Sequence, residues 1–228
     1  MIDFHSHQPP QDSGSSIRSL LISEADKITE HDLFSVGIHP WYSENIDMKS
    51  ELASLETLLR RLNVIAVGEI GFDKTRGASI DKQIELFEKQ VQIAEKLQKP
   101  VVIHCVRAWA ELLESRKRLK PTTPWAIHGF RGQSELAKQL VDFGMFISFG
   151  PGILNASEIL HETIRTVPLN RIFVETDELD VSLKYLYTTM SKIKKVRFRD
   201  LDENINRNFA EFFKKVESGK WQVSNEIR

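Results

Sequence analysis

The chain has 228 residues, enough for one large domain, and its 31 lysines and arginines nearly balance 32 aspartates and glutamates. A net charge of -1 gives no global basic field, so any contact with nucleic acid must be local. Its single cysteine, Cys105, excludes an internal disulfide and suits a reducing compartment. Without a basic apolar leader or a run of about 18 apolar residues, the sequence indicates a cytoplasmic protein, with no membrane contact.

Short apolar segments rich in β-branched or aromatic residues predict buried strands. They are 1–5, 33–39, 63–69, 100–104, 124–128, 145–150 and 171–177. Longer segments with helical spacing lie between them, which is typical of a parallel sheet with helical crossovers. In 51–62 the expected buried face holds Leu52, Leu55, Leu59 and Leu62, and in 81–98 it holds Ile84, Phe87, Val91 and Ala94.

The remaining segments complete a single predicted domain over residues 1–228. The serine-rich stretch 12–19 is interpreted as a long loop after the first strand. An eighth strand, short or distorted, is expected near "VRF" at 196–198, and residues 219–228 are expected to fray.

Most of the predicted strands end in a side chain able to bind metal. These residues are His5, His7, Glu69, His104, His128 and Asp177, and His39 is a further polar group at such an end. In parallel α/β folds the carboxyl ends of the strands carry the active site. An open sheet would separate the first and seventh strands by roughly 30 Å, too far for shared ligands. The pattern therefore favours a closed (β/α)8 barrel of the TIM type.

The alternation of side chains along a strand places Asp3, His5 and His7 on one face. Asp3 is therefore expected to support the site by orienting an imidazole. Cys105 alternates with His104 and is interpreted as a small core residue and not as a nucleophile.

Six short strings occur in order along nearly the whole chain. They are "DFHSH" at 3–7, "GIHP" at 37–40, "VGEIGFD" at 67–73, "PVVIHC" at 100–105, "HGFRG" at 128–132 and "VETDE" at 174–178. On these strings the sequence resembles the TatD family of metal-dependent hydrolases, often described as TatD-type deoxyribonucleases, within the amidohydrolase-like barrels.

The resemblance implies two divalent metal ions, of zinc, manganese, magnesium or iron. His5, His7 and Asp177 would hold one, His104 and His128 the other, and Glu69 would bridge both. It also implies hydrolysis of a phosphoester by a metal-bridging hydroxide, with Glu69 and Asp177 as catalytic residues and His39 meeting the substrate phosphate. The best-known activity of the family is nuclease action on DNA 3′ ends.

Three departures from the family pattern bear on the substrate. Arg107 stands one place later than the arginine expected after the fourth-strand histidine, and Arg131 replaces a small hydroxyl residue. Both arginines are interpreted as phosphate-binding residues, with solvated surface charges as an equally weighted alternative. The substrate-binding segment expected after Asp177 is missing, since a helical pattern follows almost directly.

These departures leave three functions open. The first is a 3′ exonuclease acting on DNA, and the second is a phosphoesterase or amidohydrolase acting on small molecules through a remodelled pocket. A barrel that has lost catalysis is the least favoured, because all six ligand positions are occupied by ligand types. The sequence gives no sign of an obligate protein partner.

Overall fold

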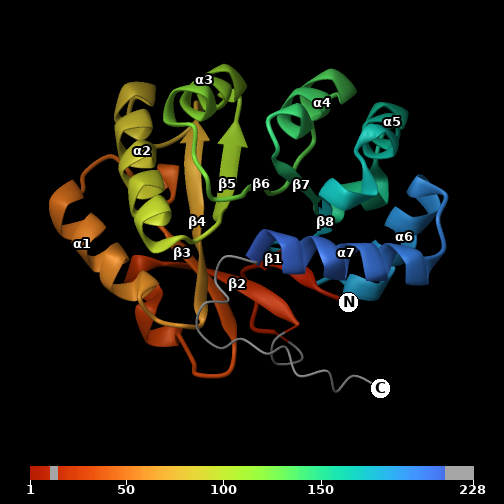
Figure 1. Ribbon diagram of the computed structural model, residues 1–228, viewed down its shortest axis with the longest axis horizontal. Helices are drawn as coiled ribbons and strands as arrows, with labels where there is room; N and C mark the ends of the chain where they lie inside the picture. Colours follow the sequence, from red (N-terminus) through yellow and green to blue (C-terminus); the bar gives the residue numbers. More distant parts are fainter. Residues whose placement is uncertain (11–14, 214–228) are drawn as a thin grey trace.

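The computed structural model describes residues 1–10 and 15–213 as eight parallel strands in sequential order, with helices between them. The strands are β1 Asp3–Ser6, β2 Ser16–Leu21, β3 Leu33–Gly37, β4 Val64–Asp73, β5 Val101–Val106, β6 Trp125–Ile127, β7 Phe146–Phe149 and β8 Ile172–Val174. The helices are α1 Met48–Leu59, α2 Ile80–Leu97, α3 Trp109–Leu119, α4 Ser134–Asp142, α5 Glu158–Thr166, α6 Leu183–Lys194 and α7 Phe198–Phe213. Figure 1 shows the helices arranged around the strands.

The sheet comes close to closing into a barrel where β1 meets the end of β8. Ser6 and Asp177 form a parallel bridge. The Asp177 N–H donates to the carbonyl of His5, and the His7 N–H donates to the carbonyl of Asp177, both at 3.0 Å. The predicted (β/α)8 barrel is confirmed, and these bonds join the two ends of the sheet within the site itself.

The position of one strand was predicted wrongly. Residues 16–21, most of which were assigned to or beside the first loop, form β2 between β1 and β3. The expected strand at 196–198 does not form, because Phe198 begins α7. β2 escaped notice because serines occupy two of its buried positions, Ser16 and Ser19, where a hydrophobic pattern is expected.

The predicted helices are present, with shifted bounds in the first. Asp47 caps α1 by accepting from the N–H groups of Lys49 and Ser50, so the helix starts earlier than expected. Leu62 lies beyond its end and is 68% exposed, contrary to the prediction. In α2 the expected core residues are buried except Ile84, which is half-buried. Residues 219–228, expected to fray, lie outside the described residues.

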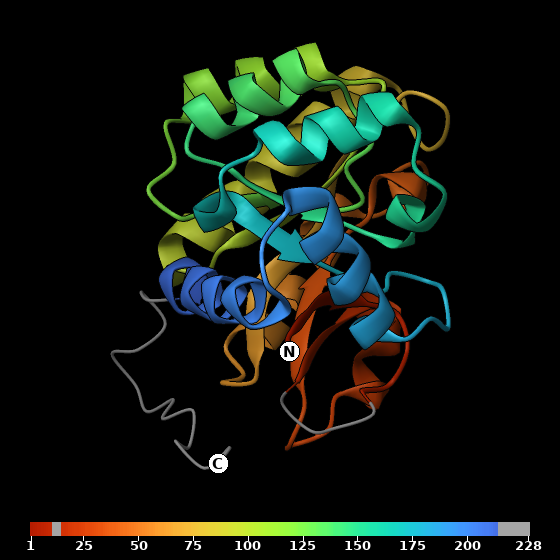
Figure 2. The ribbon, with the colours of Figure 1, turned by 90° about the vertical axis from the view of Figure 1, so that its right-hand side faces the viewer.

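α7 covers the outer face of the strands where the sheet closes, near the N-terminus (Figure 2). Phe212 of this helix packs edge-on against Phe4 of β1 and Phe173 of β8. Asn208 donates to the carbonyls of Leu169 and Ile172, which fixes the helix to the start of β8. Within residues 1–10 and 15–213, every helix is too short or too polar to cross a bilayer.

One glycine sets the separation of the strands beneath the site. Gly71 of β4 lies in register with His104 of β5, with φ at 143°. A Cβ at Gly71 would lie 2.0 Å from the carbonyl oxygen of His104. Glycine therefore allows β4 to approach the strand that carries a predicted ligand.

Candidate metal centre

The six predicted ligands converge at the carboxyl ends of the strands. They are His5 of β1 with His7 just after it, Glu69 of β4, His104 of β5, and His128 and Asp177, which follow β6 and β8. His5 and Glu69 are buried, and the other four are half-buried. All six belong to overlapping groups of three whose ligand atoms lie within 4.8 Å of one another.

Glu69 lies at the centre of this cluster. Its Oε1 atom is 3.2 Å from Nε2 of His5 and 3.0 Å from Nε2 of His7. Its Oε2 atom is 2.7 Å from Nε2 of His128 and 3.6 Å from Nδ1 of His104. The two oxygens of one carboxylate therefore face two different pairs of histidines.

Asp177 completes the side of the cluster that holds the first pair. Its Oδ1 atom lies 3.8 Å from Nε2 of both His5 and His7. The backbone of Asp177 is left-handed, with φ at 56°, a conformation that costs a non-glycine residue about 1 to 3 kcal/mol and is found at functional sites. The backbone bonds to His5 and His7 described above hold it in this conformation.

His5 provides the test of whether these residues fit a metal ion. Its side chain is fully buried, and neither ring nitrogen makes a hydrogen bond with a described residue. Its Nε2 atom lies 3.2 Å from Oε1 of Glu69 but outside hydrogen-bond geometry. Buried polar groups are normally hydrogen-bonded, so a buried imidazole with no hydrogen bond indicates a ligand. Neutral imidazoles and carboxylates together suit zinc, manganese or iron(II), and the donor set therefore fits a divalent transition-metal ion.

The charges in the cluster also favour a cation. Burial would raise the pKa of Glu69, but the His128 and His5 imidazoles bring it well below its ordinary value. Burial would lower the pKa of His128, yet the Glu69 and Glu175 carboxylates raise it well above its usual range. Burial and the charge of Glu175 both raise the pKa of Asp177. Carboxylates this close together need positive charge among them.

Sequence reasoning missed Glu175, which supports His128. This carboxylate is fully buried, and its Oε1 atom lies 3.5 Å from Nδ1 of His128. The same oxygen accepts the N–H of Gly129 at 2.5 Å. The Glu175 carboxylate thereby faces Nδ1 of the ring whose other nitrogen faces Glu69, and its charge favours that orientation. Its even spacing from Asp177 was the available signal.

Asp73 plays the matching part for His104 and was also missed. Its Oδ2 atom is 3.3 Å from Nε2 of His104 and accepts the indole N–H of Trp41 at 2.6 Å. Hydrogen bonds offset burial and lower the pKa of Asp73 to about 2, so the carboxylate stays charged. Asp73 directs Nδ1 of His104 toward Glu69. The even spacing of residues 69, 71 and 73 on β4 was the signal.

Asp3 lies beside the cluster but does not contact an imidazole as expected. Its carboxylate accepts the N–H of Thr176 at 3.0 Å and the Thr176 hydroxyl at 2.6 Å. Burial raises the pKa of Asp3 to about 6 against these hydrogen bonds. Because Thr176 precedes Asp177, Asp3 holds the turn that carries a predicted ligand. Its expected part is taken by Glu175 and Asp73.

His39 was predicted to contact only the substrate, but its side chain lies next to the predicted metal ligands. Its Nε2 atom is 3.6 Å from Oε2 of Glu69, and its Nδ1 atom accepts the N–H of Trp41 at 3.2 Å. His39, Glu69 and His104 form one of the groups able to hold a cation. Burial lowers the pKa of His39 despite the nearby Glu69, which keeps the ring neutral.

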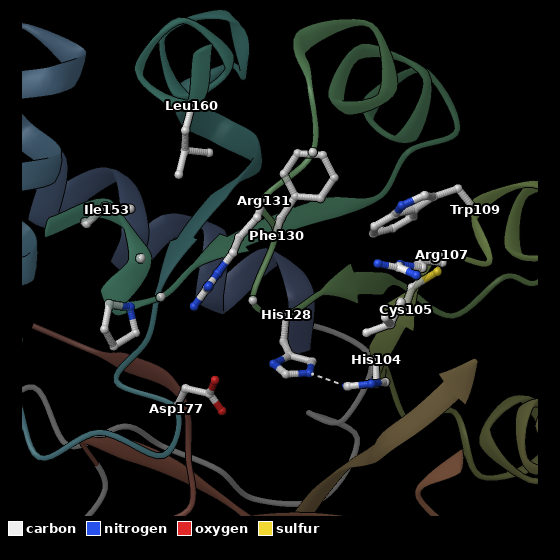
Figure 3. A pocket seen from close by; sticks show the side chains of 16 residues that line it. His104, Cys105, Arg107, Trp109, His128, Phe130, Arg131, Ile153, Leu160 and Asp177 are labelled. Atoms are coloured by element: carbon white, nitrogen blue, oxygen red, sulfur yellow. Dashed lines mark hydrogen bonds between the residues drawn. The ribbon is translucent and has the colours of Figure 1, made fainter. Parts of the chain in front are cut away.

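A cavity of about 430 Å³ opens beside the cluster, and Figure 3 shows the side chains that line it. Asp177, His104 and His128 border it on the side of the cluster. Arg107 and Arg131, the predicted phosphate-binding residues, are exposed and also line it. Cys105 is half-buried at the wall, and burial raises the pKa of its thiol, which keeps the sulfur protonated.

Comparison with known proteins adds a family and several relatives. The family model described as TatD related DNase matches residues 14–214. The metal-dependent hydrolase YcfH of Escherichia coli K12 is 34% identical over 161 residues, which cover 69% of this chain and 58% of YcfH. The 3′-5′ ssDNA/RNA exonuclease TatD of Citrobacter koseri is 31% identical over 147 residues, covering 63% of this chain and 56% of that protein.

A human relative and a solved structure extend the comparison. The 3′-5′ RNA nuclease TATDN2 is 32% identical over 161 residues, which cover 67% of this chain and 21% of the human protein. The crystal structure of the TatD homologue YjjV from E. coli K12 has a TM-score of 0.75 and 22% identity, and the match covers 87% of this chain and 86% of that one. That structure shares the barrel fold. The matched regions span less than two thirds of YcfH, the C. koseri nuclease and TATDN2.

Proposed function

The chain belongs to the TatD family, and from that premise we propose that it is a divalent-metal-dependent hydrolase of phosphodiester bonds, acting as a nuclease at DNA 3′ ends. One observation carries the proposal: the two oxygens of Glu69 face two separate histidine pairs at the mouth of the barrel. Relatives described as 3′-5′ nucleases support the choice of bond and of strand end.

Two metal positions follow from the donors. His5, His7 and Asp177 would hold one ion, His104 and His128 the other, and Glu69 would contribute one oxygen to each. When bound, such ions supply Lewis-acid activation of water and of the phosphoryl group. The net reaction adds water across the P–O ester bond and yields a phosphomonoester and an alcohol.

Asp177 and Glu69 are the proposed catalytic residues. Asp177 borders the cavity, and burial and Glu175 raise its pKa, so its carboxylate is suited to accept a proton from water and deliver it to the departing oxygen. Glu69 stays ionised because its pKa is held low, which suits a carboxylate that remains a ligand throughout.

The remaining polar residues would bind the substrate. His39 is neutral and lies near Glu69, where its Nε2 atom could meet a phosphate oxygen as a hydrogen-bond donor. Arg107 and Arg131 would neutralise phosphate charge from the cavity, since guanidinium groups suit oxyanions. With one cysteine that stays a thiol, the chain suits a reducing compartment, and we place it in the cytoplasm.

The second candidate is a phosphoesterase or amidohydrolase of small molecules. It is favoured by the short connection between β8 and α6, by a cavity of about 430 Å³ beside the cluster, and by the balanced net charge. A pocket at the lower end of the range for small ligands fits one nucleotide or a compound of similar size.

The test measures bound metal and hydrolysis with added Mn²⁺, Mg²⁺ or Zn²⁺. Glu69→Ala and Asp177→Ala are expected to lower both, whereas Glu30→Ala, at an exposed position before β3, keeps them. Unchanged metal content and rate in both site variants would refute the proposal. Single-stranded DNA compared with nucleotides and aryl phosphates then separates the two candidates, because an exonuclease shortens the DNA from its 3′ end.

A further inference from the structure

The cavity beside the cluster is built from the loops that follow β5, β6 and β7. Its apolar part is formed by Trp109, Phe130, Ile153 and Leu160, and it extends from the cluster toward α3 and α5 (Figure 3). A volume of about 430 Å³ admits a group of about the size of one nucleotide next to the reacting bond.

Two guanidinium groups border this cavity from different loops. Arg107 follows β5 and Arg131 follows β6, and Figure 3 shows Arg107 close to Trp109 and Arg131 close to Phe130. Among residues 1–10 and 15–213, neither arginine forms an ion pair or a side-chain hydrogen bond with another described residue. The nearby Lys74 by contrast pairs with Glu111 at 2.6 Å. Both arginines are thus available for an anion.

The backbone after β7 is shaped to hold Arg131. A Cβ at Gly152 would lie 3.0 Å from Nε and 3.3 Å from Cζ of Arg131. The guanidinium therefore lies directly against the backbone of the 3-10 turn Pro151–Asn155. A larger residue at 152 would push Arg131 away from this position.

Another connection at the mouth carries the opposite charge. The connection between β8 and α6 holds Asp177 and the exposed Glu178 and Asp180. Phosphates that extend over this connection would be repelled, whereas phosphates toward the loops after β5 and β6 meet Arg107 and Arg131. The distribution of charge therefore favours a substrate whose short anionic extension lies toward the loops after β5 and β6.

We propose that the cavity is a subsite for a second phosphate, beside the one that is cleaved, and that the preferred substrate is a strand end that carries a terminal phosphate. This proposal rests on the proposed function, because it assumes that the cluster cleaves the neighbouring phosphodiester. Arg131 is its specificity residue and Gly152 fixes the place of that arginine.

The test uses the full chain loaded with Mn²⁺ and four probes: bis(p-nitrophenyl) phosphate, the dinucleotide TpT, and the same dinucleotide with a 5′ phosphate (pTpT) or a 3′ phosphate (TpTp). The kcat/KM of at least one phosphorylated dinucleotide is expected to exceed that of TpT by about 10- to 100-fold, the effect of hydrogen bonds to a charged group. The probe that gains identifies which terminal phosphate the cavity accepts.

Each variant is judged by the ratio of kcat/KM for the preferred dinucleotide to kcat/KM for TpT, so that a loss of folded protein cancels. Arg131→Ser is expected to bring the ratio close to one, and Gly152→Ala to an intermediate value. Arg61→Ser is the control, since Arg61 follows α1 at the opposite end of the barrel and its loss changes the net charge equally; its ratio should match the wild type.

The outcomes separate this inference from the function beneath it. If none of the four probes is hydrolysed, the proposed function fails and the subsite fails with it. If the probes are hydrolysed but the wild type does not distinguish TpT from either phosphorylated form, the subsite alone is refuted. A preference that persists in Arg131→Ser equally refutes the assignment to Arg131.

Discussion

On the outer face of β1 and β8, aromatic rings pack beneath α7, with the centroids of Phe4 and Phe173 4.1 Å apart. On the inner side, His5 of β1 lies fully buried with no hydrogen bond to a described residue, and Asp177, which follows β8, holds a left-handed backbone. Adjacent positions along β1 therefore carry opposite kinds of side chain.

The difference separates stability from chemistry. Each buried phenylalanine ring on the outer face removes apolar surface from water and carries no charged or polar group that needs a partner. Each charged or unpartnered group on the inner face costs free energy unless it is paired or bound to a cation. We therefore expect substitutions on the outer face to change stability and substitutions on the inner face to change metal binding.

The largest effect is expected at Phe173 on the outer face. Phe173→Ala should lower the free energy of unfolding by about 3 to 5 kcal/mol, because it leaves a cavity among Phe4, Phe146 and Phe212. Urea denaturation measures the change. Tyr185→Ala, at a residue 58% exposed, serves as the control with little effect. A comparable loss in both variants would contradict the prediction.

A buried charge far from the site gives the next effect. Lys99 precedes β5, donates to the carbonyl of Val64, and burial lowers its pKa to about 8. Between pH 8 and about 10 the unfolded chain keeps this proton while the folded one loses it, so stability should rise with pH through that window. Below pH 8 the cost of the buried charge is fully present.

The measurement compares the wild type with Lys99→Met, because other buried groups titrate in the same range. The free energy of unfolding of the wild type should gain about 2 to 3 kcal/mol on the variant between pH 8 and 10. Parallel pH profiles for the two proteins would show that Lys99 is not responsible.

The smallest effect is expected on the inner side, at Asp73 beside His104. Asp73→Asn should weaken metal affinity or activity by about 10- to 100-fold, because an amide no longer directs the His104 ring as a carboxylate does. Metal titration by calorimetry measures it. Asp26→Asn, at an exposed position, is the matched control. Unchanged affinity in Asp73→Asn would remove this residue from the support of the site.

Much of the fold was predictable because most strands are apolar runs that end at polar residues. β2 was not, since Ser16 and Ser19 fill buried positions, and Ser19 faces Glu69 with its hydroxyl 3.5 Å from Oε1. An inner face near a polar cluster accepts serine where a sequence pattern expects valine or leucine. The alternation of apolar and polar residues along the sequence could not by itself identify this strand.

The sequence predicted the six residues of the cluster, but it did not predict the carboxylates that contact their histidine rings. The motifs at the strand ends identified all six predicted ligands, and the structure places these residues together. The same motifs contain Asp73 and Glu175, but they did not show that these carboxylates lie next to His104 and His128. Which carboxylate contacts which ring depends on side-chain directions across strands. Asp3 illustrates the limit, because it shares a face with His5 yet bonds to Thr176.

The backbone contact between Asp177 and the two histidines of β1 also governs when the site can form during synthesis. A growing chain that has emerged only as far as β6 contains His5, His7 and Glu69 but neither Asp177 nor the strand that closes the barrel. Domains generally fold as units during synthesis, so the barrel closes only after β8 and the residues that follow it have emerged. The proposed ligand set is therefore complete only after residue 177 has emerged, and a fragment truncated before residue 172 would lack both Asp177 and the strand that closes the barrel.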